Sequence, residues 1–174
     1  QIGHSVFGHV INTEPRDMYL ARVAAMDAGV PETVPAMNVN RLCGSGVQAV
    51  VSGAQALMLG DADFALVGGA ECMSRAPFIL PDVRWGTKMG DTRSLDMMLG
   101  ALNCPFGTGH MGVTAENVAA EHGLTREEQD AFALTSQERA ADAIGAGHFT
   151  REITPVMVKR KRETVAFDTD EHPK

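Results

Sequence analysis

Apolar residues in the N-terminal part of the chain fall alternately into short runs and helix-length segments. Residues 5–11 are rich in β-branched and aromatic residues, which predicts a strand. Asp17–Ala28 carries apolar residues at helical spacing and is followed by Gly29, a typical helix stop. Residues 35–40 and Phe64–Val67 predict two further strands. Strands and helices therefore alternate along this part of the chain.

A sharp turn at residues 41–46, with two glycines, separates the second and third strands. It leads into Val47–Leu59, which is apolar on nearly all sides and is therefore expected to be a buried helix. The order strand, helix, strand, helix, strand is typical of a parallel sheet built from βαβ units. Strands that are mostly apolar, rather than alternating, fit a sheet covered on both faces. We expect residues 1–74 to form an α/β domain.

The pattern changes in the second half of the chain. From Cys72 to Met111 the periodicity disappears in a stretch rich in Met, Gly and Pro, and an insert of this length is usually functional. Val113–His122 then predicts a helix, and Thr125 with Glu128 predicts a capping box that starts another. The final predicted unit is a hairpin, made of strands Ile153–Val158 and Thr164–Phe167 around a charged turn at Lys159–Arg162. We expect residues 75–174 to form a second, helix-rich domain.

Composition narrows the class of protein. The 174 residues carry a net charge of −7, and 44% of them are hydrophobic, which excludes a disordered tail. The acidic balance argues against a nucleic-acid partner, and no apolar run has the roughly 18 residues that a membrane span needs. The three cysteines lack a CxxC spacing, so neither a disulfide framework nor a metal site is expected. Free thiols favour a reducing compartment, the cytoplasm.

Cys43 is the best candidate for chemistry. It lies between a predicted strand and the N-terminus of a predicted helix, where free N–H groups and the helix dipole favour a thiolate. Gly44 and Gly46 allow a ligand to approach the backbone closely, and an N–H group beside the nucleophile can hold an oxyanion. The alternative is a buried, inert cysteine that fills space. Cys72 is expected in the core, and Cys104 in the irregular stretch.

A cysteine nucleophile needs a base, most often histidine. His110 lies in a glycine-rich stretch just before a predicted helix, although its spacing alone favours a packed loop histidine. His122 and His148 lie on or after amphipathic helices and are expected at the surface. The chain begins at Gln1 without an initiator Met and ends without a closing element, so we expect it to be part of a longer protein.

Three motifs resemble the thiolase family. Asn40–Gly46 reads NRLCGSG, Gly68–Ser74 reads GGAECMS, and Gly109–Asn117 reads GHMGVTAEN. Their order and spacing also agree, so the resemblance covers essentially the whole chain. It is closest to bacterial β-ketothiolases (acetyl-CoA acyltransferases) of the kind that supply polyhydroxyalkanoate synthesis, a subgroup supported by the stretch at residues 12–19.

The resemblance implies a thiolase-like fold, with a partial N-terminal βαβαβ half and part of an α-rich loop domain. Cys43 would be acylated by acetyl-CoA or 3-ketoacyl-CoA in a ping-pong reaction. Leu102, His110 and Met111 match positions that line the pantetheine tunnel. No metal or other cofactor is implied, and the assembly would be a homodimer or homotetramer. The family's general-base His, in a Gly-His-Pro motif, and its second catalytic Cys, in a Cys-x-Gly motif, are absent here, so the isolated segment is expected to be inactive.

Three other interpretations are compatible with parts of the sequence. A ketoacyl-synthase-like condensing enzyme also places a cysteine at a helix start, but the pair His110 and Met111 and the long insert disfavour it. A non-catalytic structural fragment would leave Cys43 inert. A redox or metal protein is weakened by the cysteine spacing.

Overall fold

The computed structural model describes residues 1–161 and 163–173. The chain divides into two compact units, Gln1–Thr114 and Ala115–Lys174. The first unit contains the sheet and Cys43, and the second contains a long helix and a hairpin. The expected division into domains 1–74 and 75–174 concerns function and stays a prediction.

A parallel sheet of three strands forms the centre of the first unit. Its order is β2-β1-β3, with Val6 of the central strand paired to Met37 on one side and Val67 on the other. The α/β prediction is therefore confirmed. The first strand ends at Gly8 rather than at Ile11, because the N–H groups of Val10 and Ile11 donate to the Glu71 carboxylate. The strands are β1 (His4–Gly8), β2 (Ala36–Val39) and β3 (Ala65–Gly69).

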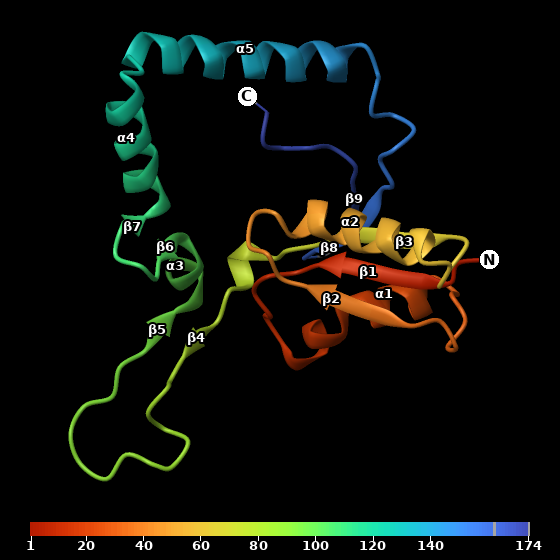
Figure 1. The fold of residues 1–174 in the computed structure, drawn as a ribbon, viewed down its shortest axis with the longest axis horizontal. Coiled ribbons are helices and arrows are strands. Elements are labelled where there is room, and N and C mark those ends of the chain that lie inside the picture. Colours follow the sequence, from red (N-terminus) through yellow and green to blue (C-terminus); the bar gives the residue numbers. More distant parts are fainter. Residues whose placement is uncertain (162, 174) are drawn as a thin grey trace. The chain divides into compact units, whose positions relative to one another are not determined.

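Helices α1 (Leu20–Asp27) and α2 (Ser45–Met58) cover opposite faces of this sheet, as Figure 1 shows. A turn of 3-10 helix, η1 (Pro15–Tyr19), occupies the first residues of the helix predicted from Asp17, so α1 begins later than expected. The core between helices and sheet is built from small side chains. Its fully buried or nearly buried members include Val6, Ala21, Ala25, Ala49 and Ala56.

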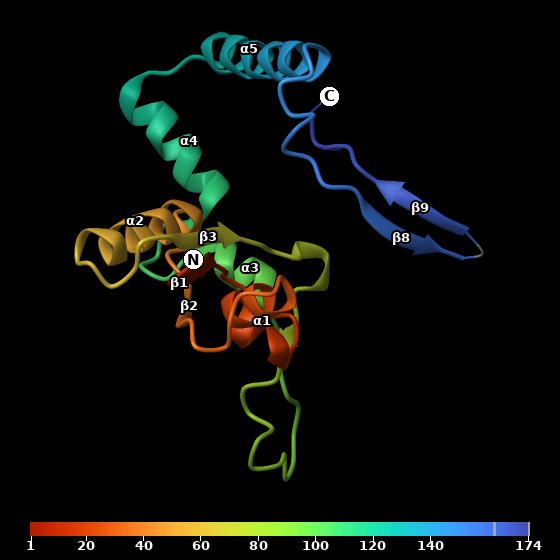
Figure 2. The same ribbon diagram turned by 90° about the vertical axis from the view of Figure 1, so that its right-hand side faces the viewer.

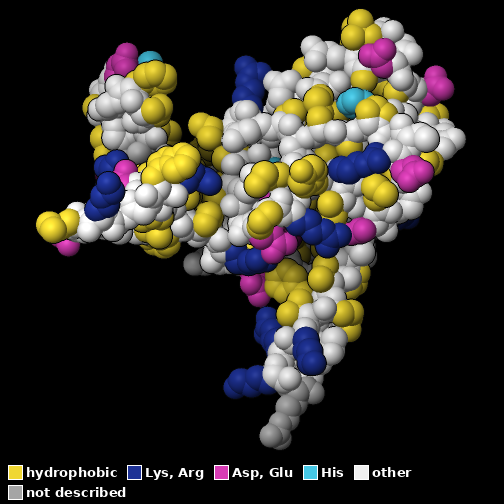
Figure 3. Space-filling view, turned by 90° about the horizontal axis from the view of Figure 1, so that it is seen from below, with side chains coloured by type: hydrophobic (Ala, Val, Ile, Leu, Met, Phe, Trp, Pro, Cys, Tyr) yellow, Lys and Arg dark blue, Asp and Glu magenta, His cyan; other side chains and the backbone are white. Residues whose placement is uncertain are grey.

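Helix α2 contradicts the prediction of burial on all sides. The face that packs on β1 and β3 carries Ala49, Gly53 and Ala56, and an added Cβ at Gly53 would meet Val67 Cγ1 at 2.5 Å. The other face stays exposed in the described part of the chain, with Met58 at 86%. Within these residues the sheet covers only one side of α2, so the predicted burial on all sides is not reached in this chain. Exposed hydrophobic side chains are also frequent on the face shown in Figure 3, where they lie among charged ones.

The lack of periodicity after Cys72 suggested a stretch without regular elements, but the structure shows several short ones there. Its strands have two residues each, too few to show a period, and α3 is short. Asp96 caps α3, since its Oδ1 accepts the N–H groups of Met98 at 2.8 Å and Leu99 at 3.3 Å. A long loop joins β4 to β5 (Figures 1 and 2). The elements are η2 (Met73–Arg75), β4 (Phe78–Ile79), β5 (Leu95–Asp96), α3 (Met97–Leu102), β6 (Asn103–Cys104) and β7 (Gly109–His110).

The second unit confirms the predicted helices and hairpin. The capping box forms as expected, with the Glu128 N–H donating to Thr125 Oγ1 at 3.2 Å and the Thr125 N–H to Glu128 Oε2 at 2.8 Å. The first hairpin strand is shifted toward the turn, from the predicted Ile153–Val158 to Val156–Arg160, because Lys159 and Arg160 pair with the second strand, which begins one residue earlier than predicted, at Glu163. Lys161 lies in the turn, and Arg162 lies outside the described residues. Figure 2 shows the hairpin most clearly. The elements are α4 (Met111–His122), which starts in the first unit, α5 (Arg126–Gly145), β8 (Val156–Arg160) and β9 (Glu163–Phe167).

The described helices include none with the length and apolar character that crossing a membrane requires.

His122 and His148 are exposed, as predicted.

Asp17 ties the loop after β1 to η1, and its titration gives a pH-dependent prediction. Its Oδ2 accepts the Thr13 hydroxyl at 2.8 Å and the Thr13 N–H at 2.7 Å, and these bonds hold the pKa of Asp17 below its ordinary 3.8. A carboxyl with a lowered folded-state pKa stabilises the fold above 3.8, and the stabilisation is lost as pH falls through the folded-state pKa. Asp17→Asn should therefore be less stable than wild type at pH 7 in urea unfolding, with the difference shrinking below pH 3.8.

Asp27→Asn is the matched control for this prediction. Asp27 is an exposed carboxylate that pairs with Arg16 at 3.4 Å, and such surface pairs contribute little. A stability difference for Asp17→Asn that is the same at pH 7 and in acid would contradict the assigned role of the charge.

Candidate active site

The turn between β2 and α2 holds Cys43 in a constrained backbone. Ser45 is buried; its Oγ accepts the Arg41 N–H at 2.9 Å and donates to the Leu42 carbonyl at 2.6 Å. The Gly44 N–H donates to the Arg41 carbonyl at 3.0 Å. Leu42 has φ +47°, a left-handed conformation that is costly for a side chain of this size. Strain of this kind is often found where a functional group must be presented in one orientation.

Cys43 itself is exposed and lies two residues before the first residue of α2. The N–H groups of the first turn of a helix point out from this end, which also carries the positive end of the helix dipole. The interpretation of Cys43 as a buried space-filling residue is therefore wrong. Its sulfur is accessible, and it lies where an oxyanion is favoured.

A cavity of about 510 Å³ lies in front of Cys43, within the first unit. Its wall is mainly apolar and comes from the carboxyl ends of β1 and β3, the Cys43 turn and helix α3. In α/β folds, ligands bind in the crevice outside the carboxyl ends of the strands, and a volume of this size is typical of a small-molecule site. The lining of the cavity includes Val10, Ile11, Leu42, Glu71, Met98 and Leu102.

The structure brings together two of the four residues singled out from the sequence. Leu102, at the end of α3, lines the same cavity as Cys43. His110 and Met111 are exposed and are absent from the described lining of this cavity. His110 Nδ1 instead accepts the Gly112 N–H at 3.0 Å. Contact of these two residues with a pantetheine arm stays a prediction.

The two other cysteines differ from Cys43 in setting. Cys72 is exposed rather than in the core, because β3 ends at Gly69 and the chain has already left the sheet. Cys104 is half-buried at the end of β6. Hydrogen bonds from the Thr108 hydroxyl and from the Phe106 N–H lower the pKa of its thiol.

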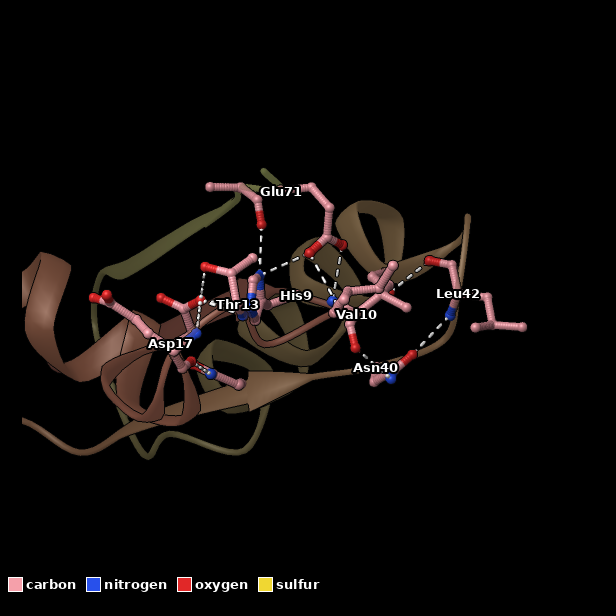
Figure 4. Close-up of polar contacts among 12 residues, drawn as sticks. His9, Val10, Thr13, Asp17, Asn40, Leu42 and Glu71 are labelled. Carbon is pink, nitrogen blue, oxygen red and sulfur yellow. Dashed lines mark hydrogen bonds and ion pairs between the residues drawn. The ribbon is translucent and has the colours of Figure 1, made fainter. Parts of the chain in front are cut away.

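Sequence reasoning missed Glu71, the only charged residue among the described residues that line the cavity. Its Oε2 accepts the Val10 N–H at 2.9 Å, and its Oε1 accepts the Ile11 N–H at 3.1 Å and lies 3.0 Å from His9 Nδ1 (Figure 4). A signal was available. Glu71 lies shortly after the end of β3, as Cys43 lies shortly after the end of β2, and the carboxyl ends of parallel strands meet at one edge of a sheet.

The whole sequence, residues 1–174, matches the family described as thiolase, N-terminal domain. It is 60% identical over 171 residues to the beta-ketothiolase BktB of Cupriavidus necator, covering 98% of this chain and 43% of that protein. It is 48% identical over 176 residues to an acetyl-CoA acetyltransferase of Pseudomonas aeruginosa, covering 100% and 44%. The chain thus spans less than half the length of these relatives.

Solved structures give the same result. Human mitochondrial 3-ketoacyl-CoA thiolase superposes with a TM-score of 0.91 at 39% identity, covering 98% of this chain and 44% of that one. A structure of human mitochondrial 3-ketoacyl-CoA thiolase in complex with CoA matches with a TM-score of 0.88 at 38% identity, covering 99% and 44%.

Proposed function

We propose, since this chain belongs to the thiolase family as a thiolase N-terminal domain, that it supplies the nucleophile of an acyl-CoA acyltransferase that makes or cleaves 3-ketoacyl-CoA. The relatives are named beta-ketothiolase and acetyl-CoA acetyltransferase. The observation that carries the proposal is the exposed Cys43 at the start of α2, on the wall of a mainly apolar cavity of about 510 Å³. Membership of this family sets aside the ketoacyl-synthase alternative.

The proposed reaction has two halves that share a thioester on Cys43. In thiolysis, the Cys43 thiolate attacks the 3-keto carbon, the bond between C2 and C3 breaks, and acetyl-CoA leaves as an enolate that takes up a proton. The acyl group then passes to the sulfur of a second CoA. In the reverse direction, acetyl-CoA acylates Cys43 and CoA leaves as the thiol. A second acetyl-CoA then loses a proton from C2, and its enolate attacks the Cys43 thioester carbonyl, so that the bond between C2 and C3 forms and the Cys43 thiolate is released. Dividing the transfer in this way is covalent catalysis with ping-pong kinetics.

The residues of this chain favour the acyl-transfer half of that cycle. The Cys43 N–H, beside the start of α2, is suited to hold the oxyanion that forms on the attacked carbonyl. Apolar side chains from Met98 and Leu102 give the acyl group and the slender CoA arm a dry, adaptable surface. We propose that His110 and Met111 contact the pantetheine arm. Proton transfer falls to the Gly-His-Pro and Cys-x-Gly motifs of the family, which do not occur in these residues.

Mapping of the covalent adduct tests this assignment. The full-length protein that carries this chain is incubated with acetyl-CoA, quenched in acid and digested for mass spectrometry. We expect the acetyl group on Cys43. An acetyl group on Cys72 or Cys104 in place of Cys43, or on none of them, contradicts the proposal. Cys104 is the informative comparison, since its lowered thiol pKa makes it the competing reactive thiol.

For the whole protein we further propose a homodimer or homotetramer that works in the cytoplasm on acetyl-CoA and 3-ketoacyl-CoA, without a metal or other cofactor. The net charge of −7 fits the absence of a nucleic-acid partner. Light scattering of the full-length protein measures the oligomeric state.

A further inference from the structure

His9 is a buried polar residue that the proposed reaction does not use. Its side chain is only 5% exposed, and its Nδ1 lies 2.7 Å from the Ala70 carbonyl oxygen and 3.0 Å from Glu71 Oε1. Both of these atoms are acceptors, so Nδ1 carries the hydrogen and donates it. On the other side of the ring, Nε2 lies 4.0 Å from Asp17 Oδ2. The imidazole is thus held through Nδ1 at the carboxyl ends of β1 and β3, while its buried Nε2 has no hydrogen-bond partner among the described residues.

The Glu71 carboxylate connects His9 to the backbone of the loop after β1. Besides facing His9, it accepts the N–H groups of Val10 and Ile11, at 2.9 and 3.1 Å. Its side chain is 29% exposed, so these bonds are partly shielded from water. Val10, Ile11 and Glu71 all line the cavity in front of Cys43.

Val10 is held on its other side as well. Its carbonyl accepts the Asn40 Nδ2–H at 3.4 Å, and Asn40 Oδ1 accepts the Leu42 N–H at 3.0 Å. Figure 4 shows the continuous series from His9 through Glu71, Val10 and Asn40 to Leu42. Leu42 is the left-handed residue directly before Cys43, with φ +47°. Such a conformation persists only where surrounding contacts hold it.

We propose that His9, Glu71 and Asn40 are positioning residues for Cys43. The proposal rests on the function proposed above, and none of the three touches the reacting atoms in it. His9 orients the Glu71 carboxylate, Glu71 fixes the Val10 backbone, and Asn40 links that backbone to the Leu42 N–H. The series sets the direction in which Cys43 meets a thioester carbonyl and the wall against which the acyl group lies. Alignment of this kind should change the rate at which Cys43 is acylated by a bound thioester more than it changes the intrinsic reactivity of the Cys43 thiol.

The test compares two reactions of Cys43 in the full-length protein. Acylation by acetyl-CoA needs an aligned carbonyl, whereas alkylation by iodoacetamide needs only a reactive, accessible thiol. For Glu71→Gln and Asn40→Ala we expect acylation to slow by about tenfold or more, while alkylation stays within about twofold. Asn40→Asp, which keeps an oxygen for the Leu42 N–H, should acylate faster than Asn40→Ala.

Rescue at His9 separates positioning from bulk packing. His9→Leu fills the space but removes the donor, and its acylation should slow. His9→Asn can place an amide N–H where Nδ1 stands, and it should recover most of that loss. Glu32→Gln, at an exposed carboxylate of the same unit, is the control.

The outcomes distinguish failure of the proposed function from failure of the positioning role alone. If wild type carries no acetyl group on Cys43, the proposed function fails, and this proposal fails with it. If wild type is acetylated normally and Glu71→Gln and Asn40→Ala match it, only the positioning role is overturned. A parallel fall of acylation, alkylation and melting temperature also overturns it, because that pattern indicates general loss of structure.

Discussion

Replacing Cys43 with serine is expected to lower the turnover of 3-ketoacyl-CoA by the full-length protein by about a thousandfold or more. A serine hydroxyl in the same place is not ionised at neutral pH and is a far weaker nucleophile than a thiolate. The fold should be unaffected, since Cys43 is exposed and no packing is removed. Thiolysis of acetoacetyl-CoA at saturating CoA gives the rate, and circular dichroism gives the check on folding.

Cys72→Ser is the matched control for this substitution. Cys72 is also exposed, but it is not among the residues that line the cavity in the described part of the chain. The Cys72→Ser protein should keep a thiolysis rate close to that of wild type. A Cys43→Ser rate within tenfold of wild type would mean that the acyl group does not pass through this residue.

Gly8→Ala is expected to have the second largest effect, on both stability and activity. A Cβ at Gly8 would lie 2.8 Å from the backbone carbonyl carbon of Ser45 and 2.9 Å from its Cβ and oxygen. The first turn of α2 must therefore shift. Such overpacking costs about 1–3 kcal/mol of unfolding free energy. Ser45 also closes the turn of Cys43 through its two hydrogen bonds, so the shift should misalign Cys43, the proposed nucleophile.

We expect turnover in Gly8→Ala to fall by about a hundredfold, the penalty of roughly 1 Å misplacement at a reacting group. Urea unfolding and kcat are measured on the same preparation. Gly145→Ala is the control, because an added Cβ there meets nothing within 4 Å and the position is helical. A Gly8→Ala protein with wild-type stability and rate would mean that the contact between β1 and α2 is looser than the structure has it.

The two variants report on different links between structure and activity. Cys43→Ser removes the reacting atom and leaves its surroundings. Gly8→Ala leaves the reacting atom and moves its surroundings. A loss of kcat in both, with lowered stability only in Gly8→Ala, is the pattern that the geometry predicts.

Local patterns were enough to predict most of the elements and the place of Cys43 just before a helix. The strands are marked by β-branched runs, α5 by the box of Thr125 and Glu128, and Cys43 by its place before an apolar helix. These signals are local because backbone propensities and caps depend on residues a few positions apart. Short elements such as α3 were not predicted, because six residues are too few to show a helical period.

The sequence by itself therefore determined an α/β unit with Cys43 at the start of its second helix, because periodicity, glycine turns and caps act over a few residues. Only the tertiary structure decided what surrounds Cys43. The sheet order β2-β1-β3 brings His9, after β1, against Glu71, after β3, although 62 positions separate them (71 − 9). The tertiary structure also placed Leu102 on the wall of the cavity in front of Cys43. It left His110 and Met111 out of the described lining of that cavity, and one face of α2 exposed within the described residues. Contacts between residues so far apart depend on which strands pair and how helices pack on them, and the spacing of residues along the chain does not contain that information.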